Sequence, residues 1–96
     1  MYGLIGSFSA HPGKREELIA LMTQSVGDMP GCRSYQVARD TTDPDKLWIT
    51  EVWDSAESHK ASLQIPAVAE TIKQAMPLIA SFGDHIETEP AGGTGL

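Results

Sequence analysis

The chain has one cysteine, no long apolar run and few basic residues, and each shortage argues against a class of protein. Cys32 has no second cysteine with which to form an internal disulfide, which agrees with a reducing compartment. No apolar stretch approaches the roughly 20 residues that a membrane-spanning helix needs, so no membrane crossing is expected. Seven Lys and Arg residues are scattered among 13 Asp and Glu, for a formal net charge of -6. No basic patch results, and nucleic acid is not an expected partner.

The length of 96 residues suits a single domain with one core. Residues 1–88 are predicted to form this domain, and residues 89–96, with little apolar content, a flexible tail. A domain this small is only marginally stable alone, which favours association into a homodimer. Residues 1–9 contain no basic segment that leads into a long apolar stretch. A secretory signal is therefore not expected, and the expected location is cytoplasmic.

Alternating apolar residues predict four β-strands, at residues 2–9, 32–39, 46–53 and within 78–87. In the first strand, Tyr2, Leu4 and Phe8 share one face. The second and third strands flank a polar stretch that contains the turn sequence Asp43-Pro44-Asp45. These two strands are therefore expected to pair as an antiparallel hairpin.

The third strand is apolar on both faces. Leu47, Ile49 and Trp53 alternate with Trp48 and Val52 along it. Helices can cover one face of a small sheet, so the other face needs a partner sheet or a ligand pocket. This pattern is a second indication of a dimer.

Three-and-four spacing of apolar residues predicts helices before and after the hairpin. The first opens in the segment 12–17 and must stop by Pro30, because proline cannot continue a helix. The last runs from Pro66 to Met76 and ends at Pro77. The apolar stripe of the first helix is Leu18, Leu21, Met22 and Val26, and that of the last is Val68, Ile72, Ala75 and Met76.

A short helix is predicted directly after the third strand. Asp54 is expected to be its N-cap, with Glu57 three positions on to complete a capping box. Ala56, His59 and Leu63 fall on one face at helical spacing, so His59 is expected to point into the interior.

The resulting order is strand, helix, strand, strand, helix, strand, with the helical pair of the second half as an elaboration. This order is the split βαβ or ferredoxin-like plan of an α+β protein. It predicts an antiparallel four-stranded sheet with helices on one face.

The segment 51–63 holds the densest group of candidate site residues. His59 suits proton transfer near neutral pH, and the alternative is a histidine packed in the core. Trp53 offers a flat wall and an N–H donor to an aromatic ring, and simple core packing is the alternative. Because Ile49, Glu51 and Trp53 share a strand face, these side chains and His59 are expected to line one cavity.

Glu51 is unusual among apolar neighbours, since a carboxylate on a buried face needs a partner or a raised pKa. It is expected to pair with Arg33 or Arg39 on the adjacent strand, with a role in the site as the alternative. Tyr35 lies between the two arginines and either supplies a hydroxyl to the pocket or merely packs.

The remaining candidates for metal or nucleophilic chemistry are isolated. His11 and His85 form no ligand spacing with each other or with Cys32, so no metal site is expected. No glycine-rich phosphate loop, nucleophile elbow or catalytic triad pattern is present.

One stretch resembles a known family. A strand that ends in Glu51-Val52-Trp53, a short helix that bears His59 and a helix that begins at Pro66 are similar to the central segment of the antibiotic-biosynthesis monooxygenase family. The helix start Pro12-Gly13-Lys14 and the junction Met29–Tyr35 also resemble that family. The similarity covers roughly residues 2–87.

The resemblance implies a dimeric α+β barrel, in which each sheet packs on its partner. It also implies oxidation of small aromatic substrates by O2 without a metal, flavin or other cofactor. Many relatives place a histidine where this chain has Ser62, whereas His59 stands one turn earlier. Haem-degrading relatives use an asparagine near the first strand, and the absence of asparagine here argues against haem degradation.

These observations lead to the hypothesis of a cofactor-independent monooxygenase that oxidises a small dihydroxy-aromatic or quinol-like substrate. His59 is the expected base, Trp53 holds the ring, and Glu51 orients His59 or a substrate hydroxyl. One alternative is a dimeric module that binds a small hydrophobic ligand without catalysis, and another is a polyketide cyclase or isomerase on the same barrel. The expected substrate-binding residues are Phe8, Tyr35, Ile49, Ser62, Leu63 and Phe82.

Overall fold

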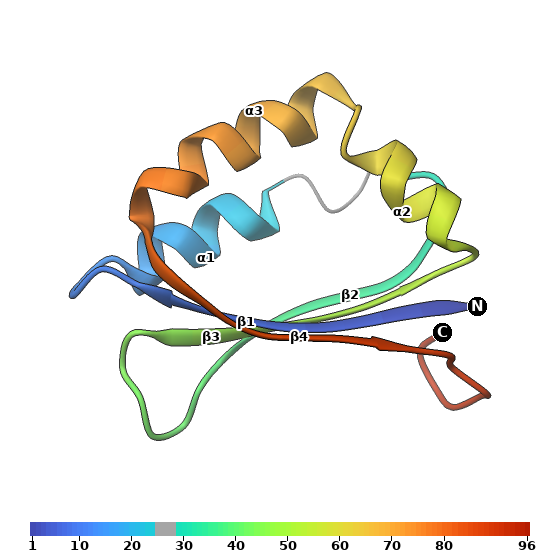
Figure 1. Ribbon diagram of the computed structural model, residues 1–96, viewed down its shortest axis with the longest axis horizontal. Coiled ribbons are helices and arrows are strands. Elements are labelled where there is room, and N and C mark those ends of the chain that lie inside the picture. The colour runs from blue at the N-terminus through green and yellow to red at the C-terminus, as the bar shows by residue number, and fades with distance from the viewer. Residues whose placement is uncertain (25–28) are drawn as a thin grey trace.

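The computed structural model describes residues 1–24 and 29–96 and contains a four-stranded antiparallel sheet with helices on one face (Figure 1). The strands lie in the order β2-β3-β1-β4, which is the arrangement of the predicted ferredoxin-like plan. The strands are β1 (Tyr2–Ala10), β2 (Cys32–Arg39), β3 (Lys46–Trp53) and β4 (Ile79–Thr88). The hairpin strands have the bounds that the sequence predicts.

Helices pack over the same face of the sheet from both halves of the chain (Figure 1). They are α1 (Arg15–Thr23), α2 (Ala56–Ser62), α3 (Pro66–Ala75) and the 3-10 turn η1 (Met76–Leu78). Pro66 occupies the first turn of α3, as predicted. Val26, predicted for the stripe of the first helix, lies outside the described residues. No helix in the described part of the chain is long and apolar enough to cross a membrane.

The N-terminus of α2 differs from its predicted form. Ser55, not Asp54, is the N-cap, and its hydroxyl accepts a 3.1 Å hydrogen bond from the backbone N–H of Ser58. Asp54 instead prolongs the β-ladder, because its own N–H donates to the carbonyl of Gly31 at 2.8 Å. The Asp54 carboxylate lies 2.6 Å from Arg33 Nε. Pairing between strands therefore moves the helix start one residue along.

The core lies between the sheet and the helices α1 and α3. Leu18 and Leu47 are fully buried at its centre, with Ala10 and Ala75 beside them. Further along β3 toward α2, Ile49 and Trp53 are also buried. Burial of these side chains gives the sheet its helix-covered face, and this face continues into the candidate site.

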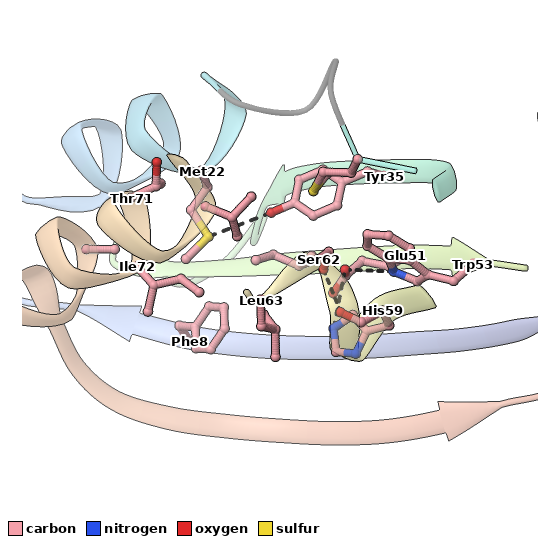
Figure 2. Close-up of a pocket in the computed structure, with 14 residues that line it drawn as sticks. Phe8, Met22, Tyr35, Glu51, Trp53, His59, Ser62, Leu63, Thr71 and Ile72 are labelled. Carbon is pink, nitrogen blue, oxygen red and sulfur yellow. Dashed lines mark hydrogen bonds and ion pairs between the residues drawn. The ribbon is translucent and has the colours of Figure 1, made fainter. Parts of the chain in front are cut away.

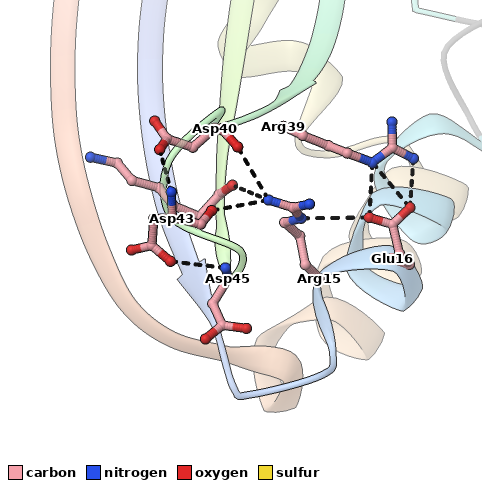
Figure 3. Close-up of polar contacts among 7 residues, drawn as sticks. Arg15, Glu16, Arg39, Asp40, Asp43 and Asp45 are labelled. Atoms are coloured by element: carbon pink, nitrogen blue, oxygen red, sulfur yellow. Dashed lines mark hydrogen bonds and ion pairs between the residues drawn. The ribbon is translucent and has the colours of Figure 1, made fainter.

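The turn of the hairpin is tied to α1 (Figure 3). Arg15 donates from Nη1 to the carbonyls of Asp40, Asp43 and Lys46 at 3.4, 3.0 and 3.4 Å. The Asp40 carboxylate accepts a 2.8 Å hydrogen bond from Trp48 Nε1. This bond, with those from residues 42 and 43, holds the pKa of Asp40 well below its usual range.

The opposite face of the sheet carries apolar side chains that the helices do not cover. Ile5 of β1 lies opposite Ile86 of β4, and Ile86 is 48% exposed. Trp48 of β3 shares this face and is half-buried, with Lys46 Nζ 4.6 Å from the centre of its ring. This face is the predicted place for a partner sheet.

Candidate functional site

A cavity of about 190 Å³ lies between the helix-covered face of the sheet and the helices (Figure 2). Its walls come from all three α-helices and from strands β1, β2 and β3, and they are mostly apolar. Eight of the nine residues that the sequence analysis assigned to the site line this cavity: Phe8, Tyr35, Ile49, Glu51, Trp53, His59, Ser62 and Leu63. The fold therefore gathers residues that are up to 55 positions apart in the chain.

One end of the cavity holds a cluster of three polar groups around one oxygen atom. Strand alternation places Glu51 and Trp53 on the same face of β3, and Trp53 Nε1 donates a 3.1 Å hydrogen bond to Glu51 Oε1. His59 of α2 approaches from the helix layer, with Nε2 3.9 Å from the same oxygen (Figure 2). A carboxylate, an indole N–H and an imidazole thus converge at the polar end of an apolar pocket.

The Glu51 carboxyl is set apart from water by its position. Its side chain is only 16% exposed. Burial raises the pKa of Glu51 above its usual range, while the hydrogen bond from Trp53 and the charges of His59 and His85 act in the opposite direction. The net shift is upward, so the carboxyl binds a proton more readily than an exposed glutamate does.

The predicted pairing of Glu51 with an arginine is wrong. Tyr35 is the residue directly across from Glu51 on β2. Arg39 lies across from Leu47 near the other end of β3, where its guanidinium bonds to Glu16 of α1. The strand register therefore leaves the imidazole of His59 as the basic group that pairs with this carboxylate among the described residues.

His59 sits among aromatic rings. The centre of its ring is 5.4 Å from that of Trp53, edge to face, and 5.9 Å from that of Tyr2. Its side chain is 23% exposed. The helix α2, which carries His59, packs closely against the turn before β2. A Cβ on Gly31 in that turn would lie 2.7 Å from Ser58 Cβ, so the position of α2 depends on glycine there.

The inward face of α2 is not quite the predicted one. Ala56 is exposed, whereas Ser62, three positions after His59, is 3% exposed. Ser62 lines the cavity, but its hydroxyl donates a 2.6 Å hydrogen bond to the carbonyl of His59. Leu63 lines the cavity although it is 41% exposed. The helix therefore turns the side that bears Ser62 toward the interior, and not the side that bears Ala56.

Tyr35 and Phe82, both predicted to bind substrate, do not line the same cavity. The Tyr35 hydroxyl lines the cavity and lies 4.0 Å from Met22 Sδ, and burial raises the pKa of this phenol. Phe82 of β4 lies outside the cavity and is 63% exposed. It makes an edge-to-face contact of 5.3 Å with Phe8 and lines an adjoining groove.

The sequence analysis did not assign several residues that contribute to the site. Thr71 and Ile72 of α3 close the cavity from the helix side. The three-and-four stripe of that helix contained Ile72 and was the available signal. His85, which influences the pKa of Glu51, had no sequence signal because its facing depends on how β4 pairs with β1. Within residues 1–24 and 29–96, no group of three His, Cys, Asp or Glu side chains is placed to hold a metal ion.

Residues 1–74 match the family described as Antibiotic biosynthesis monooxygenase, and the match includes all of the strand β3 and the helix α2. The chain belongs to this family. The matched segment contains the Glu51, Trp53 and His59 cluster.

Solved structures of proteins assigned to the same family share this fold. A protein from Chloroflexus aurantiacus J-10-fl, assigned to the same family, is 56% identical with a TM-score of 0.95, over 98% of this chain and 96% of that one. A protein from Deinococcus radiodurans, also assigned to it, is 24% identical with a TM-score of 0.80, over 100% and 98%. At that identity the likeness concerns the fold alone.

A curated relative is an uncharacterized protein of Synechocystis sp., 30% identical over 78 residues. The aligned region covers 78% of this chain and 53% of the relative. The chain thus spans about half the length of this relative.

Proposed function

We propose that the chain is a cofactor-independent monooxygenase that oxidises a small dihydroxy-aromatic or quinol-like substrate with O2. The observation that carries this proposal is the half-buried Glu51–His59 pair at the polar end of an apolar cavity. Such a cavity accepts a flat apolar ring, and the pair accepts a proton from a hydroxyl group on it.

The first step is removal of a phenolic proton. The His59 imidazole accepts this proton, and the Glu51 carboxyl lies 3.9 Å from His59 Nε2. The imidazolium that forms is stabilised by the neighbouring carboxylate. Either group alone would be a poorer base, because a lone charge in this pocket has no nearby counter-charge.

The second step is reaction of the substrate anion with O2. The anion transfers electrons to O2, a C–O bond forms at a ring carbon, and the resulting peroxide takes back the proton held at the Glu51–His59 pair to give a hydroperoxide. The hydroperoxide then loses water. The O–O bond breaks, the proton on the same ring carbon leaves with the outer oxygen, and a carbonyl group remains. The substrate loses four electrons in total, and one oxygen atom enters the product while the other leaves as water. The apolar walls exclude bulk water from the charged intermediate.

Trp53 has two parts in this proposal. Its ring forms one wall of the cavity at the reacting end, and its N–H holds Glu51 Oε1. Phe8, Ile49 and Leu63 supply the remaining apolar contact. Tyr35 keeps its proton, because burial raises its pKa, and its hydroxyl stays a hydrogen-bond donor.

We also propose that two copies pair through the sheet face opposite the helices. Ile5, Trp48 and Ile86 give this face an apolar centre that a second sheet would bury. Light scattering on the purified protein tests the pairing: a dimer at micromolar concentration is expected, and Ile86→Lys should shift it to monomer. A wild-type monomer at that concentration would refute the paired-sheet arrangement.

A non-catalytic binding module is the second candidate, and Ser62 favours it. The Ser62 hydroxyl donates a hydrogen bond to a backbone carbonyl, and Ser62 stands at the position where many relatives have a histidine. A polyketide cyclase or isomerase on the same fold would also use the Glu51–His59 pair for proton transfer, but it would consume no O2.

Oxygen uptake separates these functions. The purified protein, treated with a chelator, is mixed with a panel of dihydroxynaphthalenes and anthrone-like compounds beside His59→Ala and a Lys60→Ala control on the exposed side of α2. Uptake that survives the chelator and falls with His59→Ala alone supports the monooxygenase. Turnover without O2 uptake supports a cyclase or isomerase, and binding without turnover supports the binding module.

A further inference from the structure

Met22 of α1 places a thioether sulfur in the wall of the inner cavity. Its side chain is half-buried and lines the cavity together with Tyr35 of β2. Figure 2 shows the Met22 sulfur directed at the Tyr35 hydroxyl, and the two atoms are 4.0 Å apart. A thioether takes up one oxygen atom from an oxidant to become a sulfoxide, so this sulfur is a candidate for chemical modification.

The Tyr35 hydroxyl has a weak partner in this contact. Burial raises the pKa of the phenol, so the hydroxyl keeps its proton and remains a hydrogen-bond donor. Within residues 1–24 and 29–96, the acceptor for this donor is the Met22 sulfur, and a thioether accepts hydrogen bonds only weakly. A stronger acceptor in the same place would therefore be stabilised by this hydroxyl.

The gap between the two atoms matches the size of one added oxygen atom. The oxygens of an O–H···O hydrogen bond lie about 2.5–3.0 Å apart. The 4.0 Å from the Tyr35 oxygen to the Met22 sulfur exceeds this range by about 1–1.5 Å, which is close to the length of a sulfur–oxygen bond. A sulfoxide oxygen directed at Tyr35 would thus accept a hydrogen bond of ordinary length with little movement of either side chain.

A small oxidant can reach this sulfur. Leu63 and Ile72 also line the cavity and are 41% and 39% exposed, so the cavity opens to solvent beside α2 and α3. Its volume of about 190 Å³ exceeds the space in which a protein cavity holds benzene, about 150 Å³. Hydrogen peroxide and small organic hydroperoxides are no larger than benzene, and both classes can therefore enter.

We propose that Met22 is a site of oxidation by peroxides, and that Tyr35 selects and holds one stereoisomer of the sulfoxide. The sulfur attacks the terminal oxygen of the peroxide, and an S–O bond forms as the O–O bond breaks. The sulfur loses two electrons and the peroxide gains them. The departing oxygen takes the proton of the transferred oxygen and leaves as water, or as an alcohol when the oxidant is an organic hydroperoxide.

Oxidation at this position changes the character of the cavity. A flexible apolar side chain becomes a polar one, and the change is reversed when a sulfoxide reductase restores the thioether. Because the peroxide is supplied from outside, the modification does not depend on the proposed function of the cavity.

The stereochemistry of the product tests the inference. The folded protein is treated briefly with hydrogen peroxide or tert-butyl hydroperoxide, unfolded and cut with trypsin, and mass spectra locate the added oxygen. The peptides are then treated with either of the two methionine sulfoxide reductases, each of which reduces one epimer. At Met22 one epimer should exceed the other by about fivefold, the preference that one ordinary hydrogen bond provides. Met76 is 48% exposed and is the internal control, with the two epimers expected in similar amounts.

Tyr35→Phe removes the donor and keeps the ring. The epimer ratio at Met22 should fall toward that of Met76, whereas Met29, which lines the same cavity, should keep its wild-type ratio. Circular dichroism checks the fold of the variant, and the comparison of Met22 with Met76 in the wild type needs no variant. An unoxidised Met22 in the folded protein, equal epimers there, or a ratio that survives Tyr35→Phe would overturn the inference. Oxygen uptake enters none of these measurements, so their failure would leave the proposed function standing.

Discussion

The indole N–H of Trp53 donates a 3.1 Å hydrogen bond to Glu51 Oε1, two positions back on the same strand. The same oxygen faces His59 Nε2 at 3.9 Å. Trp53 is 1% exposed, so this bond is made without competition from bulk water. The tryptophan is thus a positioning residue for the carboxylate as well as a wall of the cavity.

Replacement of Trp53 by phenylalanine keeps a large ring but removes the donor. Because the hydrogen bond from Trp53 lowers the pKa of Glu51, its loss should raise that pKa further. We expect the acid limb of the rate profile to move to higher pH, and the free energy of unfolding to fall by about 1–2 kcal/mol. The pH dependence of oxygen uptake measures the first effect and urea unfolding the second.

Trp48→Phe is a matched control for this substitution. Trp48 Nε1 also donates to a carboxylate, that of Asp40, but at the hairpin turn away from the cavity. This variant should lose stability and keep the pH profile of the wild type. A profile that moves equally in both variants would contradict a positioning role for Trp53.

Glu51→Gln should separate stability from activity. The folded-state pKa of Glu51 is raised above its ordinary value of 4.5, so its contribution to stability is fully present below that value and is lost as pH rises through the folded pKa. The glutamine variant should therefore gain stability relative to the wild type as pH increases toward neutrality. Oxygen uptake should fall in the same variant, because the pair loses its carboxylate.

Urea unfolding at several pH values from 4 to 8 measures this difference. Glu57→Gln, on the exposed side of α2, serves as the control and should follow the wild type at each pH. A Glu51→Gln variant that is less stable than the wild type at neutral pH would show that the ionised carboxylate is stabilising, against the direction of the pKa shift.

Arg15→Ala should loosen the hairpin turn without affecting the site. The guanidinium donates to three carbonyls of the turn and its side chain is 17% exposed (Figure 3). We expect a loss of about 1–3 kcal/mol in the free energy of unfolding, and only a small change in ligand binding. Arg15→Lys should recover part of the loss at most, because an ammonium cannot reach several carbonyls in one plane. Calorimetric melting compares the three proteins.

Gly31→Ala should disturb the candidate site through α2. Gly31 has a φ of +82°, and its added Cβ would lie 2.7 Å from Ser58 Cβ, one residue before His59. Both backbone strain and a clash are introduced, so we expect reduced stability and weaker ligand binding together.

Gly13→Ala isolates the strain from the clash. Gly13 has a similar φ of +79°, yet no heavy atom of the described chain lies within 4 Å of an added Cβ. This variant should lose about 1 kcal/mol of stability and bind ligand as the wild type does. Equal binding by Gly13→Ala and Gly31→Ala would contradict the dependence of His59 on this contact.

Local patterns in the sequence were sufficient for the elements and for most of the cavity. The hairpin strands have their predicted bounds because alternation and a turn sequence act over neighbouring residues. The same alternation placed Ile49, Glu51 and Trp53 on one face, and helical spacing placed His59 near them.

Contacts between distant segments decided the remainder. The N-cap moved from Asp54 to Ser55 because the strand ladder continues to Gly31, and Glu51 lacks an arginine because the register brings Tyr35 opposite it. Such choices depend on pairing partners, which no local pattern contains.

The side of the sheet on which Phe82 and His85 lie depends most strongly on tertiary structure. The sequence by itself determined a strand near residues 78–87, because its apolar residues and the preceding Pro77 are local signals. The side on which each residue emerges was decided by the bonds between Ser7 and Asp84, 77 positions apart. A one-residue irregularity reverses every side chain beyond it, so only the paired strands place His85 beside the cavity.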